Sequence, residues 1–418
     1  MKLKNKFTKC KVTGQKIPVI FNFGRMPIAN NFSKNLDKRN MYDMEIAFNE
    51  NNGLFQLVTA PKPKQMFNAN YAFLSSTSNS MKTHFKDVAN NIKKLMKKDS
   101  KIMEIGCNDG IFLENFKNFN HLGIEPSKNV CDISRSKKLK VVNSFFTKKL
   151  IDQKKLENKF DIIFAANVIC HIPNILDLFK CIETSLKNEG LFIFEDPYLG
   201  SMLEKTSYDQ IYDEHFYMFS AHSIIAILEK FNLKLIKAER IPTHGGSMRY
   251  YIKKTKSPKI NIELKKILEY EKKIKISKIQ TIKKFAQNCK DSKKRILKII
   301  NNLNKKGKDI YGYGATSKST TILHFCNVKD ALIKGIFDNT PTKIGKFFPA
   351  KKIKIIDYKE FKKIKPKYCF LFVFSILSSK NNYVFCNFCK YETLECPKNT
   401  RARIEQDTIV YQDWSFYR

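Results

Sequence analysis

The chain has 418 residues, more than one ordinary hydrophobic core holds, which predicts two or three domains. Its hydrophobic content of 43% is that of a globular protein. The net charge is +38, because 77 lysines and arginines face only 39 acidic residues. The lysines are spread along the whole sequence, so we expect a solvated basic surface and no nucleic-acid partner. A positive field of this kind would attract a phosphorylated or diphosphate substrate.

Neither a signal peptide nor a membrane span is predicted. The first ten residues have no apolar core. The longest apolar run, residues 369–377, is far shorter than the ~20 residues that cross a bilayer. We therefore expect a soluble, cytoplasmic protein. Its 11 cysteines then predict reduced, buried thiols rather than a disulfide framework.

Residues 1–65 contain short apolar runs broken by glycine and proline, which indicates a small β-rich unit with little core of its own. Cys10 has no second cysteine or histidine within the first 80 residues, so no zinc site is expected here. Segment 70–79 is rich in hydroxyl groups and precedes an expected helix over about residues 81–97. These hydroxyls either line a polar pocket or cap that helix.

The sequence from Lys101 to Leu113 predicts a strand and a glycine turn, followed by a helix over residues 111–119. Glycines at this point let a ligand lie against the backbone at the carboxyl end of a strand. A second strand, residues 121–124, ends in Glu125, and an acid there suits two ribose hydroxyls. The loop spacing differs from that of a dinucleotide site, so S-adenosylmethionine (SAM) is the expected cofactor; the alternative is a purely structural turn. The expected cofactor-binding residues are Glu104, Gly106, Asn108, Asp109, Gly110, Glu125 and Asn167.

Short strands alternate with helices after Lys101. Further strands are expected over residues 140–142, 160–166 and 190–195, which together predict a doubly wound parallel sheet of the α/β class. Ligands bind at the carboxyl ends of such strands. We therefore expect functional residues between Asn167 and His171 as well as in the glycine loop.

Residues 208–220 contain unusually many titratable groups, among them two acids and a histidine within Tyr-Asp-Glu-His. Such density at a ligand edge is costly unless the groups are used or paired. A strand over residues 233–240 then leads into Thr-His-Gly-Gly-Ser-Met-Arg at 243–249. Glycines beside His, Ser and Arg would let backbone amides and a guanidinium approach an anion. For each segment the alternative is ordinary loop polarity.

Residues 258–305 have apolar side chains every three or four positions, which predicts an amphipathic helical connector. A coiled-coil dimer helix is the alternative. A second strand–glycine–helix unit begins at Asp309, with a helix over 318–325 and a strand over 332–337 that ends at Asp338. We interpret it as a Rossmann-like half-domain whose glycine loop faces a cleft between domains.

Four motifs occur in the order Glu-Ile-Gly-x-Asn-Asp-Gly, Tyr-Asp-Glu-His-Phe, His-Gly-Gly-Ser-x-Arg and Gly-Tyr-Gly-Ala-x-x-Lys. Together they resemble the nucleotide-sugar C-methyltransferases of deoxysugar biosynthesis, over most of residues 10–375. The resemblance implies a zinc-binding amino-terminal domain, a class I methyltransferase domain of Rossmann-like fold that binds SAM, and a Rossmann-like carboxyl-terminal domain. The corresponding ranges here are 1–65, 66–257, a helical connector over 258–306, and 307–418.

The resemblance also implies roles for individual residues. His215 matches the base that removes a proton from the carbon beside the keto group of the sugar. Tyr212, Glu214, His171 and Tyr71 match its active-site neighbours. Such groups suit a carbon acid, which needs a base of near-neutral pKa and donors to the enolate oxygen. The residues expected to bind the nucleotide-diphosphate sugar are His244, Gly245, Gly246, Ser247, Arg249, Tyr313 and Lys318.

The sequence departs from this family at both ends. The zinc ligands of the family are paired cysteines, whereas here Cys10 is followed by Thr13, and residues 49–53 are Asn-Glu-Asn-Asn-Gly where the second pair would lie. We therefore expect no metal. The tail beyond about residue 375 does not match the closing strands of the family, and its three cysteines are too few for a zinc site. These cysteines are Cys386, Cys389 and Cys396.

The predicted function is SAM-dependent methylation of a carbon of a nucleotide-activated keto-deoxysugar, for a surface glycan or a secondary metabolite. The alternative on the same fold is an O- or N-methyltransferase that acts on a sugar or its substituent. The lost zinc ligands point to another alternative, a catalytically inactive binding or scaffold protein. The net charge alone points to a nucleic-acid methyltransferase.

Overall fold

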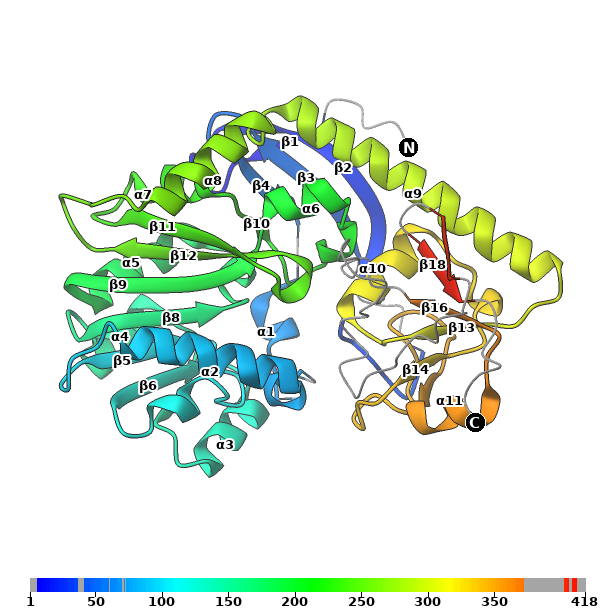
Figure 1. Cartoon of the computed structure of the whole chain (residues 1–418), viewed down its shortest axis with the longest axis horizontal. Coiled ribbons are helices and arrows are strands. Elements are labelled where there is room, and N and C mark those ends of the chain that lie inside the picture. Colours follow the sequence, from blue (N-terminus) through cyan, green and yellow to red (C-terminus); the bar gives the residue numbers. More distant parts are fainter. Residues whose placement is uncertain are drawn as a thin grey trace.

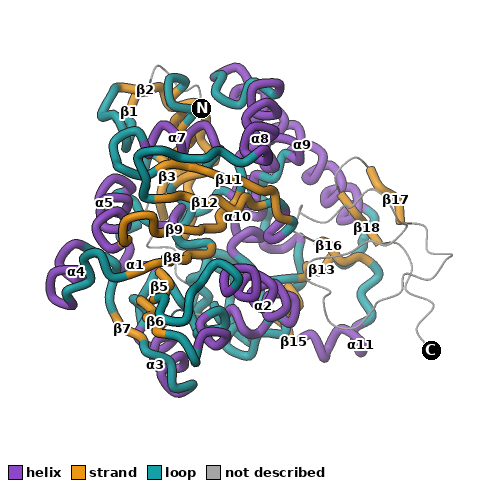
Figure 2. Tube along the Cα trace, turned by 60° about the vertical axis from the view of Figure 1, so that its left-hand side comes forward, coloured by secondary structure: helices purple, strands orange, loops and turns teal. Residues whose placement is uncertain are grey.

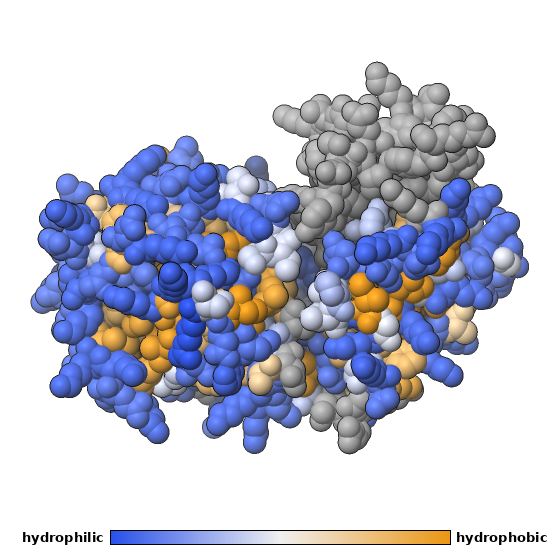
Figure 3. All heavy atoms as spheres, turned by 90° about the horizontal axis from the view of Figure 1, so that it is seen from below, coloured by the Kyte–Doolittle hydropathy of each residue, from blue (hydrophilic) through white to orange (hydrophobic). Residues whose placement is uncertain are grey.

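The computed structural model describes residues 6–36, 41–59, 61–69, 71, 73–371, 402–405 and 408–411. These residues form three sheets. Figure 1 shows two lobes, bridged at the top by an amino-terminal sheet and the long helix α9 (Ile279–Lys305). Within the described ranges, none of the helices combines the length and apolarity that a bilayer span requires. The face seen from below is predominantly hydrophilic over both lobes, with hydrophobic patches between the hydrophilic side chains (Figure 3).

The amino-terminal sheet has the strand order β1-β2-β3-β4-β10. Buried and less buried residues alternate along most of β2, because one face of the strand lies on the core. The fifth strand comes from far along the chain, so residues 1–65 alone do not complete this sheet. The bounds are β1 (Phe7–Lys9), β2 (Lys16–Pro27), β3 (Met41–Asn49), β4 (Leu54–Leu57) and β10 (Tyr217–Met218).

Hydrogen bonds between polar side chains occupy the place where the resemblance implies zinc. Asn52 Nδ2 donates to Cys10 Sγ at 3.6 Å, and Asn49 Nδ2 donates to Thr13 Oγ1 at 3.4 Å. Burial would raise the pKa of Cys10, but hydrogen bonds with Thr13 and Asn49 lower it overall. One thiol with a hydroxyl and two amides does not fit Zn²⁺, which takes cysteine, histidine and carboxylate ligands. Side-chain hydrogen bonds therefore hold the two segments of this turn together.

The second sheet has seven strands in the order β11-β12-β9-β8-β5-β6-β7. The strands from β9 to β7 are parallel, but β12 runs antiparallel to both of its neighbours. The five strands predicted to form a parallel sheet are therefore parallel, and two further strands extend the sheet beyond β9. A tight turn at residues 243–246 links β11 to β12 and can join only antiparallel strands. The bounds are β5 (Lys101–Ile105), β6 (Asn120–Glu125), β7 (Val141–Asn143), β8 (Phe160–Ala166), β9 (Leu186–Pro197), β11 (Lys234–Ile241) and β12 (Ser247–Lys253).

Helices cover both faces of this sheet (Figure 2). Buried residues of α2 and α3 belong to one hydrophobic cluster, and those of α4, α5 and α7 belong to the other. The central strand β8 is accordingly buried along most of its length. The bounds are α1 (Pro63–Met66), α2 (Asn79–Lys93), α3 (Lys128–Ser136), α4 (Lys148–Lys154), α5 (Ile175–Ser185), α6 (Leu199–Lys205) and α7 (Ala221–Leu228).

The predicted helix over residues 111–119 is wrong. Only a 3₁₀ turn, Leu113–Phe116, forms after the glycine loop. Asn115 Nδ2 donates to the backbone oxygens of Ile111 and Phe112 at 3.2 and 2.9 Å, and such bonds compete with the helical backbone pattern. Strand β6 then begins at Asn120, which leaves no length for a helix.

The connector and the third sheet follow. The amphipathic helical connector predicted over residues 258–305 is present as two helices, and the third sheet has the order β15-β14-β13-β16-β18-β17. The strand predicted over 332–337 is shorter, because a 3₁₀ turn occupies Asp330–Leu332. The three tail cysteines lie outside the described residues. The bounds are α8 (Ile262–Lys273), β13 (Ile310–Tyr313), α10 (Ser317–Phe325), β14 (Ile336–Asp338), β15 (Ile355–Asp357), α11 (Phe361–Ile364), β16 (Tyr368–Leu371), β17 (Ala402–Glu405) and β18 (Thr408–Tyr411).

Glu271 links helix α8 to the amino end of α7 and to Tyr198. The residue is 2% exposed, and its Oε1 accepts hydrogen bonds from the Ala221 backbone N–H at 2.8 Å and the Tyr198 hydroxyl at 3.0 Å. Its Oε2 accepts from the His222 backbone N–H at 2.9 Å. One carboxylate thus satisfies the first amides of α7 from a different helix.

Replacing Glu271 with alanine is expected to lower the free energy of unfolding by roughly 3 kcal/mol, because three buried donors lose their acceptor. Urea unfolding followed by circular dichroism measures the change. Glu263→Ala is the matched control: Glu263 is on the same helix but exposed, and it pairs with the exposed Lys266. We expect a change of about 0.5 kcal/mol or less for the control. Equal effects of the two variants would contradict the role assigned to Glu271.

Candidate active site

A cavity of about 1560 Å³ opens at the carboxyl edge of the seven-stranded sheet. Its walls come from that edge, from the segment leading into α2, from residues 210–215 and from the amino end of α10. A site for one ligand typically has a volume of ~300–1,000 Å³. The cavity therefore has room for two ligands at once.

Glu125 ends strand β6 and its carboxylate is held by the glycine loop. The backbone N–H of Asn108 donates to Oε2 at 3.0 Å, and that of Ser127 donates to Oε1 at 2.8 Å. Each carboxylate oxygen keeps a second lone pair, so both can still accept from ribose hydroxyls. Glu125 and Asn108 line the cavity, as does Asn167 after β8.

Glu104 is a buried acid among the residues predicted to bind the cofactor. It lines the cavity, is 3% exposed, and its Oε2 has no hydrogen-bond partner among the described residues. Burial, then the charges of Glu125 and Asp109, raise its pKa well above the ordinary value. A buried carboxyl group with a free oxygen fits a ligand that brings a positive charge, such as the ammonium group of SAM. The residues present therefore fit this cofactor.

Two predicted cofactor residues shape the loop without lining the cavity. Asp109 is fully buried, and its Oδ2 accepts from the Ser76 backbone N–H at 3.1 Å. A Cβ at Gly110 would lie 2.3 Å from Leu139 Cδ1, so this glycine permits close packing away from the ligand. The hydroxyl-rich segment serves both proposed purposes: residues 75–80 line the cavity, and Ser78 caps α2.

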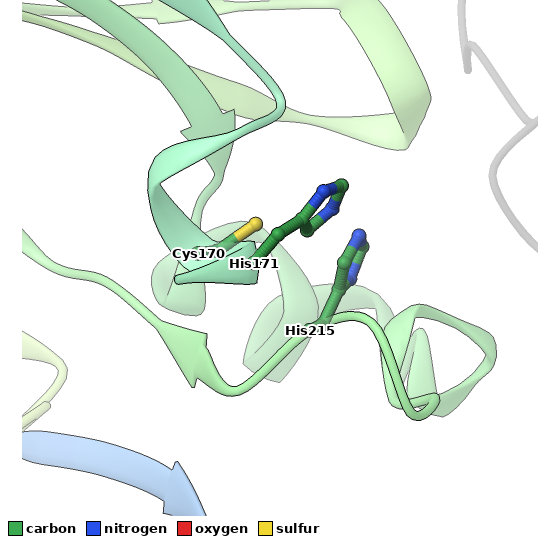
Figure 4. A group of neighbouring side chains, drawn as sticks. All are labelled: Cys170, His171 and His215. Carbon is green, nitrogen blue, oxygen red and sulfur yellow. The ribbon is translucent and has the colours of Figure 1, made fainter. Parts of the chain in front are cut away.

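His215 also lines the cavity and is 4% exposed, and its ring faces that of His171 (Figure 4). Its Nδ1 lies 2.7 Å from the backbone oxygen of Gln210. A carbonyl oxygen only accepts, so Nδ1 carries the proton and Nε2 carries the lone pair. Burial, and then the charges of His171, Lys318 and His244, lower the pKa of His215 well below 6.5. The imidazole is therefore neutral and available as a base at Nε2.

Acidic and phenolic groups surround this imidazole. The rings of Tyr212 and His215 are 4.0 Å apart between centroids. Burial and the neighbouring Glu214 raise the pKa of Tyr212 well above 10, which keeps its hydroxyl protonated as a donor. Glu214 accepts from Asn30 Nδ2 at 2.7 Å and from Tyr71, and burial together with Asp213 raises the pKa of Glu214.

Asn30 was not predicted to belong to the site, although it lines the cavity. It follows β2 and lies in a segment whose Ala29 N–H donates to Asp213 Oδ1 at 2.9 Å. Thr320 on α10 donates to the Ala29 backbone oxygen at 3.0 Å. This segment therefore connects the amino-terminal sheet to residues 208–215 and to helix α10.

Only part of the predicted substrate set reaches the cavity. His244 and Lys318 line it, and Lys318 Nζ donates to the His244 backbone oxygen at 2.9 Å. Arg249 instead pairs with Glu195 at 2.6 Å and with Glu239 at 2.7 Å, so the anion-binding role expected for it is corrected. Its strand lies between β9 and β11, which places those acids beside it. Gly245, Gly246, Ser247 and Tyr313 also lie outside the cavity lining.

Comparison with known proteins agrees with this geometry. Residues 81–238 match a family described as methyltransferase domain, and residues 242–379 match the C-methyltransferase C-terminal domain. The chain is 23% identical over 357 residues to C-methyltransferase NovU of Streptomyces niveus, across 83% of this chain and 85% of that protein. These matches identify the chain as a SAM-dependent C-methyltransferase. It is an enzyme with a class I methyltransferase fold, and its cofactor is SAM.

Solved structures similar to this C-methyltransferase have low sequence identity. A SAM-dependent methyltransferase of Archaeoglobus fulgidus is 14% identical, with a TM-score of 0.34, and covers 41% of this chain and 94% of its own. The PH0226 protein of Pyrococcus horikoshii is 16% identical, with a TM-score of 0.36, and covers 44% of this chain and 94% of its own.

Gly106 of this C-methyltransferase tests the cofactor loop. Its φ is +67°, and a Cβ there would lie 2.4 Å from Val168 Cγ2. Gly106→Ala is therefore expected to displace the loop and to raise the dissociation constant for SAM at least tenfold, measured by calorimetry, because backbone strain costs about 1–3 kcal/mol. Gly14→Ala is the control: its φ is +73°, but no atom lies within 4 Å of its added Cβ. A Gly106 variant with unchanged SAM affinity would contradict the prediction.

Cys170, His171 and His215 form the closest group of possible metal ligands among the described residues, with ligand atoms within 4.8 Å of one another (Figure 4). The two imidazoles stack with 5.1 Å between centroids and 20° between planes. Lone pairs in nearly parallel planes do not converge on one ion. Burial and then Asp196 raise the pKa of the Cys170 thiol well above its usual value. The arrangement favours proton transfer over metal binding.

Proposed function

We propose that this C-methyltransferase methylates the carbon beside the keto group of a nucleotide-activated deoxysugar. The observation that carries the proposal is the neutral imidazole of His215 beside the protonated phenol of Tyr212. Deprotonation of a carbon acid needs a base that removes the proton and a hydrogen-bond donor that stabilises the enolate oxygen. His215 and Tyr212 supply these two groups.

One wall of the cavity favours a nucleotide-diphosphate substrate. Thr316, Ser317 and Lys318 at the amino end of α10 line it, as does Lys343. The amino terminus of a helix favours anions, and lysines add positive charge. Lys343 Nζ also donates to the Ala315 backbone oxygen at 2.8 Å, so it is held beside this loop.

In the proposed methylation each residue has a separate role. His215 Nε2 takes the proton from the sugar carbon, and its Nδ1–H stays on the Gln210 oxygen. Tyr212 donates to the oxygen of the former ketone, and His171 lies stacked on His215 with Nε2 unpartnered among the described residues. Bound SAM supplies the methyl group that the carbanion takes. The proton ends on His215, and bulk water can receive it after product release.

Proton–deuterium exchange tests the proposal. Nucleotide 4-keto-6-deoxysugars are incubated with the enzyme in heavy water without SAM, and the carbon-bound protons are followed by NMR. We expect exchange at the carbon beside the ketone, which also names the methylated position. If no sugar of the panel exchanges while the enzyme still binds SAM, the keto-sugar proposal is overturned. Transfer of methyl from SAM to a sugar oxygen or nitrogen would then identify the alternative acceptor.

A further inference from the structure

His84 lies on α2 and lines the cavity, and it belongs to neither the predicted cofactor residues nor the predicted substrate residues. We propose that His84 binds the carboxylate of the methionine part of SAM, and that Glu195 is the positioning residue for its ring. The inference concerns only the cofactor, so it holds whichever acceptor the enzyme uses.

Glu195 fixes which nitrogen of His84 faces the cofactor. Burial would raise the pKa of Glu195, but His84 and Arg249 lower it overall, so the group is a carboxylate. A carboxylate only accepts, and it lies 2.7 Å from His84 Nε2, which must therefore donate. Arg249 Nε binds the other oxygen of Glu195 at 2.6 Å and balances its charge. Nδ1 of His84 is left without a hydrogen-bond partner in the described part of the chain.

The strand order places His84 at the methionine end of the cofactor. Glu125, which suits the ribose, is at the tip of β6, and the next strands along the sheet are β5, β8 and β9. The backbone N–H of Asn167 donates to the backbone oxygen of Glu195 at 2.7 Å, so Glu195 and the end of β8 are adjacent. A ligand that extends from β6 across the glycine loop therefore brings its far end to His84.

That far end of SAM carries one ammonium group and one carboxylate. Glu104, with its free buried oxygen, suits the ammonium. Both nitrogens of an imidazolium donate, so a His84 ring in that form can bind Glu195 through Nε2 and the ligand carboxylate through Nδ1. The ammonium group and the carboxylate of the methionine part of SAM would thus each face a side chain of opposite charge. A charge-assisted hydrogen bond of this kind is among the stronger polar contacts.

A ligand that lacks only the carboxylate gives a sharp test. Dissociation constants for SAM and for decarboxylated SAM, which keeps the sulfonium and the ammonium, are measured by calorimetry. We expect the wild type to bind SAM about 10- to 100-fold more tightly than decarboxylated SAM. His84→Gln should remove most of this difference by weakening SAM alone.

His121→Gln is the matched control. His121 is 5% exposed on β6, and its ring bonds the Phe119 oxygen and the Lys140 N–H, outside the cavity lining. This variant should keep the wild-type difference between the two ligands. The proposal is overturned if His84→Gln leaves SAM affinity unchanged. It is also overturned if that variant weakens both ligands equally, since its effect would then not act through the carboxylate.

Discussion

Replacing His215 with alanine is expected to lower kcat by about 10²- to 10⁴-fold, the usual contribution of a general base. The imidazole is buried and neutral, and the Gln210 backbone oxygen orients it with the Nε2 lone pair available. The same variant should abolish deuterium exchange into the sugar carbon. SAM affinity should be unchanged, because His215 is not among the residues expected to hold SAM.

His324→Ala is the control for this variant. His324 is also a largely buried histidine with one nitrogen bonded to a backbone oxygen, that of Pro349 at 2.9 Å, and burial lowers its pKa to about 4. It does not line the cavity, so its replacement should leave exchange and kcat per folded molecule intact. Full turnover by the His215 variant would refute the assignment of the base.

The pH dependence of kcat follows from the same group. A base is active when deprotonated, and the pKa of His215 lies well below its usual 6.5. The rate of the wild-type enzyme should therefore stay level as the pH falls through 6.5 and decline only at more acidic pH. A rate that halves near 6.5 would indicate an exposed imidazole rather than this buried one.

Local spacing was enough to predict the parts of the site that come from one stretch of chain. Gly106, Asn108 and Glu125 line the cavity because a strand, a turn and the next strand deliver them together. The Tyr-Asp-Glu-His motif likewise brings Tyr212 and His215 into contact within four residues.

Contacts between distant segments could not be predicted in this way. Asn30 reaches Glu214 across 184 positions, and His84 reaches Glu195 across 111. In each pair, nothing in the local sequence around one residue indicates that it contacts the other. Arg249 was misjudged for the same reason: in the sequence it follows two glycines, but the antiparallel turn of β12 places it between two acids.

Tyr212→Phe is expected to lower kcat by about 10²- to 10³-fold, the loss that follows removal of one donor to a developing oxyanion. Burial and Glu214 keep the phenol protonated, so in the wild type it can donate at any physiological pH. The ring itself remains, and with it the packing against His215. Deuterium exchange should fall by a similar factor, since the enolate forms in both reactions, whereas sugar affinity should change much less.

Tyr208→Phe separates this effect from general damage to the segment. Tyr208 is four residues earlier and fully buried, and its hydroxyl lies 3.4 Å from Ser292 Oγ and 3.7 Å from Cys326 Sγ, outside the cavity lining. Its replacement should reduce stability slightly and leave kcat near the wild-type value. If both variants lose kcat equally, the loss reflects the fold of residues 208–215. If only Tyr212→Phe loses kcat and exchange together, the hydroxyl acts on the enolate, as a carbon acceptor requires.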